Sequence, residues 1–207
     1  MMNVKANFVQ QVEKLMAAQD WLNCQYSSPD WKMQNHPFLD YVWIEVGELA
    51  EHEGQVFHYK KKSPDWEQVK LELVDILHFG LSHLIQTGKN PESTAHIFIS
   101  ATEGHKTDKT VIAYCREVAK SAINGSFDVY MFTRLVYQCG FTLQEIFDHY
   151  LNKYTLNRFR IDNGQVRGEY KKIWSDGRED NEHLVELAAS AINHDHLYQL
   201  LEARYVA

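Results

Sequence analysis

The chain has 207 residues with a hydrophobic fraction of 44% and a charged fraction of 24%, ordinary values for a soluble domain with a sizeable core. Its net charge of −7 excludes a protein whose whole surface binds nucleic acid, although a local basic pocket remains compatible with it. The amino-terminal segment lacks a signal-peptide pattern, no run approaches a membrane span, and three cysteines without a C-x-x-C pair favour a reduced, cytoplasmic chain without a membrane partner.

Apolar residues recur at helical spacing along most of the chain, and no alternating strand pattern exceeds a few residues. The sequence therefore predicts an all-α helical bundle in one catalytic domain over residues 1–207. Its helical core is expected over about residues 1–160, and a basic, substrate-closing segment with a final helix over about 161–207. The expected helices cover about residues 4–22, 38–59, 63–86, 90–104, 107–123, 126–139 and 142–160, with a last helix from about 181.

Capping residues predict where several of these helices begin and end. Ser63 as N-cap, with Pro64 at the first helical position, predicts the start of the third helix. Gly88 is expected to end that helix in the left-handed conformation. Thr142 and Glu145 match the capping-box pattern, in which each side chain accepts a hydrogen bond from the other residue's backbone.

Two pairs of acidic residues are placed unusually within predicted helices. Glu72 and Asp75 lie three residues apart in a segment that is apolar on every side, and Glu45 and Glu48 form a similar pair in the preceding helix. Burying bare carboxylates is costly unless a positive charge compensates them. Because carboxylate oxygens suit Mg²⁺ or Mn²⁺, the two pairs predict a metal site between antiparallel helices.

The residues present do not fit two other kinds of metal site. A ferritin-like di-iron site would need E-x-x-H on two helices, and the chain contains no such motif. The eleven histidines show no zinc spacing either. Solvated acids that pair with surface cations remain the alternative to a metal site.

A basic segment near the carboxyl end reverses the acidic character of the chain. Residues 153–178 contain seven basic side chains against three acidic ones. Lys153, Asn157 and Arg160 share one helical face and so present a row of donors for phosphate oxygens. Tyr170 follows a glycine-bounded loop and is available for stacking on a sugar or base. A solvated basic helix end is the alternative interpretation.

These features fall into four sequence blocks. They are Gln19-Asp20-Trp21-Leu22-Asn23; Glu45-x-x-Glu48-Leu49 with Phe57-His58-Tyr59-Lys60; Glu72-Leu73-Val74-Asp75-Ile76-x-His78-Phe79; and Lys153-x-x-Leu156-Asn157-x-Phe159-Arg160 with Gly168-x-Tyr170-x-Lys172-x-Trp174 and Glu179-Asp180-Asn181. Together the blocks resemble the dimeric, all-α dUTPases, which belong to the all-α pyrophosphohydrolases together with MazG-type enzymes and phage dCTPases. The sequence departs from the family pattern at Ile161 and Gln165.

The resemblance implies Mg²⁺-dependent hydrolysis of dUTP to dUMP and pyrophosphate, which cleans the nucleotide pool and supplies the dTMP precursor. It implies two or more ions and a homodimer, and the many apolar residues over 127–147 agree with a dimer interface. The metal ligands expected are Glu45, Glu48, Glu72 and Asp75, and Glu48 is the candidate to orient or deprotonate the attacking water. The substrate contacts expected are Gln19 and Asn23 at the uracil edge and, elsewhere, Lys60, Lys153, Asn157, Arg160, Tyr170, Lys172 and Asn181.

Two alternative functions stay open at this point. A sibling pyrophosphohydrolase would share the metal site and differ in base preference, as in a dCTPase or a MazG-like house-cleaning enzyme. A helical bundle without enzymatic activity would show no metal-dependent release of pyrophosphate.

Overall fold

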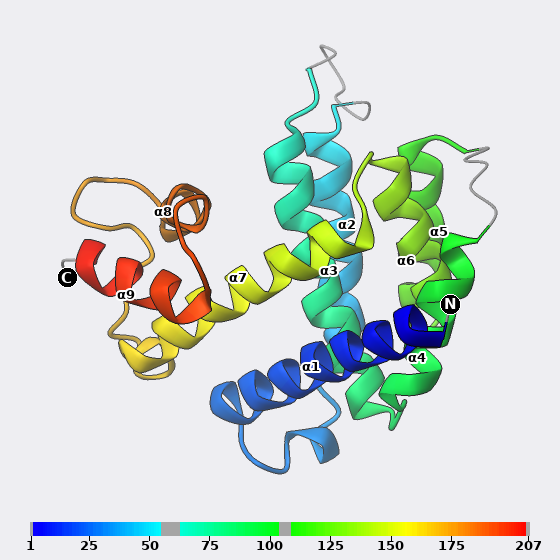
Figure 1. Cartoon of the computed structure of the whole chain (residues 1–207), viewed down its shortest axis with the longest axis horizontal. Helices are drawn as coiled ribbons and strands as arrows, with labels where there is room; N and C mark the ends of the chain where they lie inside the picture. Colours follow the sequence, from blue (N-terminus) through cyan, green and yellow to red (C-terminus); the bar gives the residue numbers. More distant parts are fainter. Residues whose placement is uncertain (1, 55–62, 104–108, 206–207) are drawn as a thin grey trace.

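The structure, a computed structural model, describes residues 2–54, 63–103 and 109–205. This part of the chain is all-α, as predicted (Figure 1). Its other regular features are the 3-10 helices η1 (Trp31–Met33) and η2 (Gln165–Arg167) and one isolated bridge between Ile173 and Glu179. The α-helices are α1 (Met2–Tyr26), α2 (Phe38–His52), α3 (Trp66–Gln86), α4 (Pro91–Thr102), α5 (Val111–Ile123), α6 (Val129–Gln138), α7 (Leu143–Asp162), α8 (Asp180–Ala188) and α9 (His194–Arg204).

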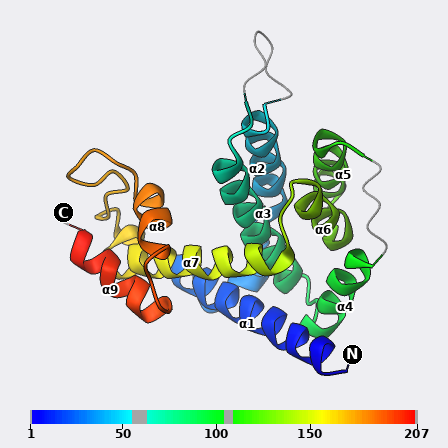
Figure 2. The same ribbon diagram turned by 45° about the horizontal axis from the view of Figure 1, so that its top comes forward.

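Helix α7 connects two apolar clusters of unequal size (Figures 1 and 2). Its first half packs with α1 and α3 in the main core, to which the α2–α3 hairpin and α4 to α6 also contribute. Its second half contacts α8 and α9, which lie together at the far end of α7. Residues 163–205, here called the C-terminal arm, share a smaller apolar cluster with α7. The buried members of that cluster are Leu156, Phe159, Trp174, Leu184, Leu187, Leu197 and Leu201.

The helix ends follow the capping pattern in most places, with one correction at the start of α3. The N-cap is Asp65, whose carboxylate accepts a hydrogen bond from the Gln68 backbone N–H at 3.2 Å, so the predicted start at Ser63 is wrong. Asp at this position both caps the helix and places negative charge at the positive end of its dipole. The left-handed conformation of Gly88 and the Thr142–Glu145 capping box are confirmed.

The largest differences between the predicted and observed helix extents concern α2 and the final helix. Helix α2 ends at His52, where Gly54 with φ of +83° turns the chain, and residues 55–59 of the predicted helix lie outside the described residues. The single final helix expected from about residue 181 is instead two helices. The chain breaks after α8, and Asn193 starts α9 by accepting a hydrogen bond from the His196 backbone N–H at 2.8 Å. The break places the apolar faces of α8 and α9 in the same small cluster.

A membrane crossing needs a long helix with few charges, and the helices within the described ranges lack that combination of length and apolar character.

Candidate active site

Three of the four predicted metal ligands meet between α2 and α3. Oxygen atoms of Glu45 on α2 and of Glu72 and Asp75 on α3 all lie within 4.8 Å of one another. The two helices form a hairpin, so Glu45 of the first acidic pair lies beside both members of the second pair. Glu72 is buried, whereas Glu45 and Asp75 are partly exposed. This arrangement of hard oxygen donors fits a divalent cation such as Mg²⁺.

The charge state of the carboxylate cluster shows that it favours positive charge. Burial, a hydrogen bond with Glu45 and the nearby negative charge of Asp75 raise the pKa of Glu72 to about 8. Burial first, and then Asp75, also raises the pKa of Glu45. At neutral pH the metal-free cluster therefore keeps a proton on Glu72, in a hydrogen bond with Glu45. A bound cation would take over the role of that proton.

Two cationic or potentially cationic groups border the cluster. The Lys153 ammonium on α7 donates a hydrogen bond to Asp75 Oδ2 at 3.0 Å, and its side chain is buried. His52 Nε2 lies 3.7 Å from Glu72 Oε1. Lys153 thus joins the carboxylates to the face of α7 that carries Asn157 and Arg160.

Glu48, the fourth predicted ligand, does not contribute an oxygen atom to the cluster. It lies one turn along α2 from Glu45 with an exposed side chain. Its negative charge still contributes to the raised pKa of both Glu45 and Glu72. Glu48 is therefore near enough to act on the cluster electrostatically without being one of its converging carboxylates.

A cavity of about 420 Å³ extends from the carboxylates to α1 and to the C-terminal arm. The sequence-predicted site residues that line it are Gln19, Asn23, Glu45, Asp75, Lys153, Asn157, Arg160, Lys172 and Asn181. Lining residues that the sequence reasoning missed or did not place in the site are Leu22, Tyr26, Phe38, His78, Phe79 and Ser82. Leu22, His78 and Phe79 lie inside the four sequence blocks. Ser82 follows His78 by one helical turn, so helical spacing alone could have placed it on the same face as His78.

One end of the cavity is a buried network of neutral polar groups. The Gln19 amide donates to Asn23 Oδ1 at 3.0 Å, and the Asn23 amide donates to Ser82 Oγ at 3.0 Å. Tyr150 donates its hydroxyl hydrogen to Gln19 Oε1 at 2.7 Å. Because these groups hold each other in place, the amide end of the cavity is preorganised.

His78 completes this network from α3. Its Nδ1 lies 2.7 Å from Gln19 Oε1, and its ring stacks on Tyr150 with 4.0 Å between centroids. Complete burial lowers the pKa of His78 to about 3, so the ring is neutral at physiological pH. Since Gln19 Oε1 accepts, Nδ1 donates, and Nε2 is left as an acceptor; among the described residues this buried atom has no hydrogen-bond partner.

The basic part of the cavity lining is shared between α7 and the C-terminal arm. Lys153, Asn157 and Arg160 come from one face of α7, and Lys172 and Asn181 come from the arm. Arg160 is already bound to Asp180, an interaction that the sequence reasoning did not include.

Of the two remaining predicted contacts, Tyr170 does not line the cavity. Tyr170 stacks on Tyr205, with ring centroids 5.3 Å apart, and donates its hydroxyl hydrogen to Asp180 Oδ2 at 2.9 Å. Lys60 lies outside the described residues.

The comparison with known protein families agrees with this geometry. The family model described as dUTPase matches residues 11–165, which is most of the chain, so the chain belongs to the dUTPase family. It is accordingly a hydrolase of the dUTP diphosphatase type. The matched range includes the carboxylate cluster, the amide network and the face of α7, whereas Lys172, Asp180 and Asn181 follow it in the sequence. No curated protein matches the chain.

Proposed function

We propose that this enzyme hydrolyses dUTP to dUMP and pyrophosphate with Mg²⁺ as its cofactor. The observation that carries the proposal is that one cavity brings together three kinds of group. A neutral amide network, members of the carboxylate cluster and a basic face all line it. These groups suit a nucleotide with its base at the amides and its phosphates between the carboxylates and the basic face.

Mg²⁺ would be held by Glu45, Glu72 and Asp75, the three residues whose oxygen atoms converge. Bound there, it would offset phosphate charge and lower the pKa of a water molecule, and two ions would share that work. We further propose Glu48 as the group that orients the attacking water. Its support is its place one turn from Glu45 and the effect of its charge on the pKa of the cluster.

The residues of the basic face would orient the phosphates. Lys153 lines the cavity beside Asp75, so a small change of its ammonium position would bring it to a phosphate oxygen. Lys172, which is exposed in the arm, and the amides of Asn157 and Asn181 offer further donors. Donors on both α7 and the arm would enclose the phosphates from two sides, so the core and the arm would act as one catalytic unit.

Base choice would come from the amide network. Uracil presents a carbonyl on each side of its N3–H donor. The side-chain amides of Gln19 and Asn23 supply donors, and neutral His78 supplies the acceptor Nε2. Phe38 and Phe79 line the cavity beside these groups and offer apolar contact to the ring.

The alternative is a sibling pyrophosphohydrolase with another base preference. Cytosine presents a bare N3 acceptor where uracil has N3–H, and this atom would face the His78 acceptor without a hydrogen between them. The mismatch would leave buried polar groups unpaired, at a cost of about 1–3 kcal/mol per group. An acceptor at His78 in contact with the base would therefore favour dUTP over dCTP.

The decisive experiment measures pyrophosphate release from each deoxynucleoside triphosphate, with Mg²⁺ and with a chelator. We expect dUTP to be cleaved in preference to dCTP and dTTP, and all activity to disappear with the chelator. Preference for another nucleotide would favour the sibling function. Release that persists without divalent metal would refute the role of the carboxylate cluster.

We also propose that the enzyme is a cytoplasmic homodimer that does not bind nucleic acid. The apolar residues over 127–147 no longer support a dimer interface, because Phe127, Phe132 and Phe147 are buried in the chain's own core. Support comes from the resemblance to dimeric dUTPases and from Tyr41, Trp43 and Ile44 on α2, each about two-fifths exposed. Sedimentation at micromolar concentration tests the dimer, and a monomer would contradict it.

A further inference from the structure

The guanidinium of Arg160 is bound within the protein, although the residue lines the cavity. Its Nε donates to Asp180 Oδ2 at 2.8 Å and its Nη2 donates to Asp180 Oδ1 at 2.7 Å. Both side chains are buried, with 7% and 1% of their surface exposed. Nη1 also donates to Asn157 Oδ1 at 3.0 Å. The fork that the sequence suggested for phosphate oxygens is therefore already used by a carboxylate.

Asp180 also closes a hairpin of the C-terminal arm. Its backbone N–H donates to the Lys172 carbonyl at 2.9 Å, and the Trp174 N–H donates to the Arg178 carbonyl at 2.9 Å. Its carboxylate accepts a hydrogen bond from Tyr170, whose hydroxyl in turn accepts one from Trp174 Nε1 at 3.2 Å. Lys172 precedes this closed segment and Asn181 follows it, and both line the cavity.

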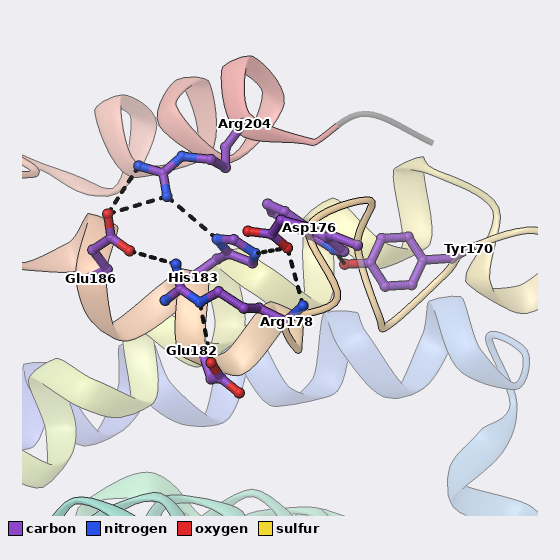
Figure 3. A network of polar contacts seen from close by, with 8 residues as sticks. Tyr170, Asp176, Arg178, Glu182, His183, Glu186 and Arg204 are labelled. Carbon is purple, nitrogen blue, oxygen red and sulfur yellow. Dashed lines mark hydrogen bonds and ion pairs between the residues drawn. The ribbon is translucent and has the colours of Figure 1, made fainter.

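The outer side of the same hairpin is tied to α8 and α9 (Figure 3). Arg178 pairs with Glu182 at 3.2 Å and with Glu186 at 3.0 Å. Arg204 on α9 reaches the same Glu186 at 3.2 Å. The hairpin, α8 and α9 thus hold one another in place within the arm. The buried Arg160–Asp180 pair joins this arm to α7 at the edge of the cavity.

We propose that Asp180 is a positioning residue that, through Arg160, fixes Lys172 and Asn181 in the nucleotide site. The inference rests on the proposed function, because it assigns those two residues to the substrate. A buried ion pair is strongly destabilised when one partner loses its charge, because the other charge is left buried without compensation. A neutral residue at position 180 would release the hairpin from α7, and Lys172 with Asn181 would no longer be held at the cavity.

A second Asp–Arg–Tyr cluster, which also connects α7 with the arm, offers a matched control. Asp162 lies 3.8 Å from Arg158 and accepts a hydrogen bond from Tyr198 on α9 at 2.7 Å. It also ties the arm to α7, but its side chain is exposed and does not line the cavity. Removing its charge loosens the arm without touching the nucleotide site.

The test compares Asp180→Asn with Asp162→Asn in steady-state hydrolysis of dUTP at saturating Mg²⁺. We expect Asp180→Asn to raise KM by about tenfold or more while kcat changes by less than about threefold, because substrate contacts are lost and the carboxylate cluster is untouched. Asp162→Asn should leave KM unchanged. An unchanged KM in folded Asp180→Asn overturns the proposal, as does an equal rise of KM in both variants.

Hydrogen exchange of the same proteins without substrate gives an independent readout. We expect faster exchange over residues 172–180 in Asp180→Asn and unchanged exchange in α2 and α3. Unchanged exchange over residues 172–180 would overturn the proposed link. If wild-type protein released no pyrophosphate from dUTP, the proposed function would be wrong. The exchange result would still test whether Asp180 holds the hairpin on α7.

Tyr170→Phe provides a milder second variant if Asp180→Asn does not fold. It removes one hydrogen bond from Asp180 without stranding a buried charge. A rise of KM of about threefold with unchanged kcat is expected, and an unchanged KM would overturn the proposal.

Discussion

The two charged sides of the cavity differ in how their charge is balanced within the protein. On the acidic side, Glu45, Glu72 and Asp75 converge, and Lys153 is the ammonium group that reaches them. On the basic side, the buried Arg160 is matched atom for atom by the Asp180 carboxylate. The acidic side keeps a proton on Glu72 to relieve its repulsion, whereas the charge of Arg160 on the basic side is already neutralised.

This difference separates a ligand site from a structural joint. A group of like charges that the fold leaves unbalanced gains free energy when a cation binds, so the carboxylate cluster is arranged for metal. A buried ion pair whose charges already balance gains little free energy when a further ligand binds. The Arg160–Asp180 pair therefore serves to hold the arm in place. Charge balance, rather than charge alone, distinguishes the two roles.

Glu72→Gln tests the acidic side and should have the largest effect. We expect Mg²⁺-dependent hydrolysis of dUTP to fall by about a thousandfold or more, because the metal site loses one anionic ligand. The thermal midpoint without metal at pH 7 should stay unchanged, since the amide resembles the protonated Glu72 that the fold already contains. Glu51→Gln, an exposed acid on α2, is the matched control. Near wild-type activity of Glu72→Gln would remove it from the metal site.

Asn23→Ala tests the neutral end of the cavity, which belongs to neither charged side. The change removes the acceptor for Gln19 and the donor for Ser82. We expect kcat/KM for dUTP to fall by more than about tenfold and the preference over dCTP to narrow. Assays with dUTP, dCTP and dTTP at saturating Mg²⁺ measure both effects. An equal fall for all three nucleotides would assign Asn23 to general architecture.

Lys172→Met tests whether the arm supplies a phosphate contact. Lys172 is exposed at the cavity edge, so its removal should leave the thermal midpoint unchanged. We expect KM for dUTP to rise by about tenfold with a smaller change in kcat. Lys171→Met changes the adjacent exposed lysine and serves as the control. Equal effects of the two substitutions would indicate general attraction of the nucleotide instead of a specific contact.

The pH dependence of stability should show the smallest effect. Folded Glu72 keeps its proton up to about pH 8, whereas the unfolded carboxyl releases it near its ordinary pKa of 4.5. The folded state therefore loses stability as pH rises between these values. We expect the thermal midpoint of the metal-free protein to fall by about 3–8 °C over this window, after allowance for partial solvent screening. Saturating Mg²⁺ or the Glu72→Gln substitution should remove this fall, and a midpoint that rose with pH would contradict it.

Local sequence rules account for the secondary structure and for the carboxylate cluster. The helical period places Glu72 and Asp75 on one face, and α2 and α3, which follow one another in the chain, pack as antiparallel neighbours. These rules also place Lys153, Asn157 and Arg160 along one face of α7. They misplaced the start of α3 and the division between α8 and α9, because several residues near each boundary are able to cap a helix.

By itself, the sequence determined an all-α chain of the dUTPase family, two acidic pairs on neighbouring helices and the existence of a basic face. Only the tertiary structure decided that three of those four acids meet without Glu48, that Asp180 takes the fork of Arg160 and that Tyr170 does not line the cavity. The physical reason is the distance along the sequence over which each kind of interaction acts. Helical periodicity relates residues one turn apart, whereas Gln19 and Tyr150, or Arg160 and Asp180, meet only after the helices pack and bury their side chains together.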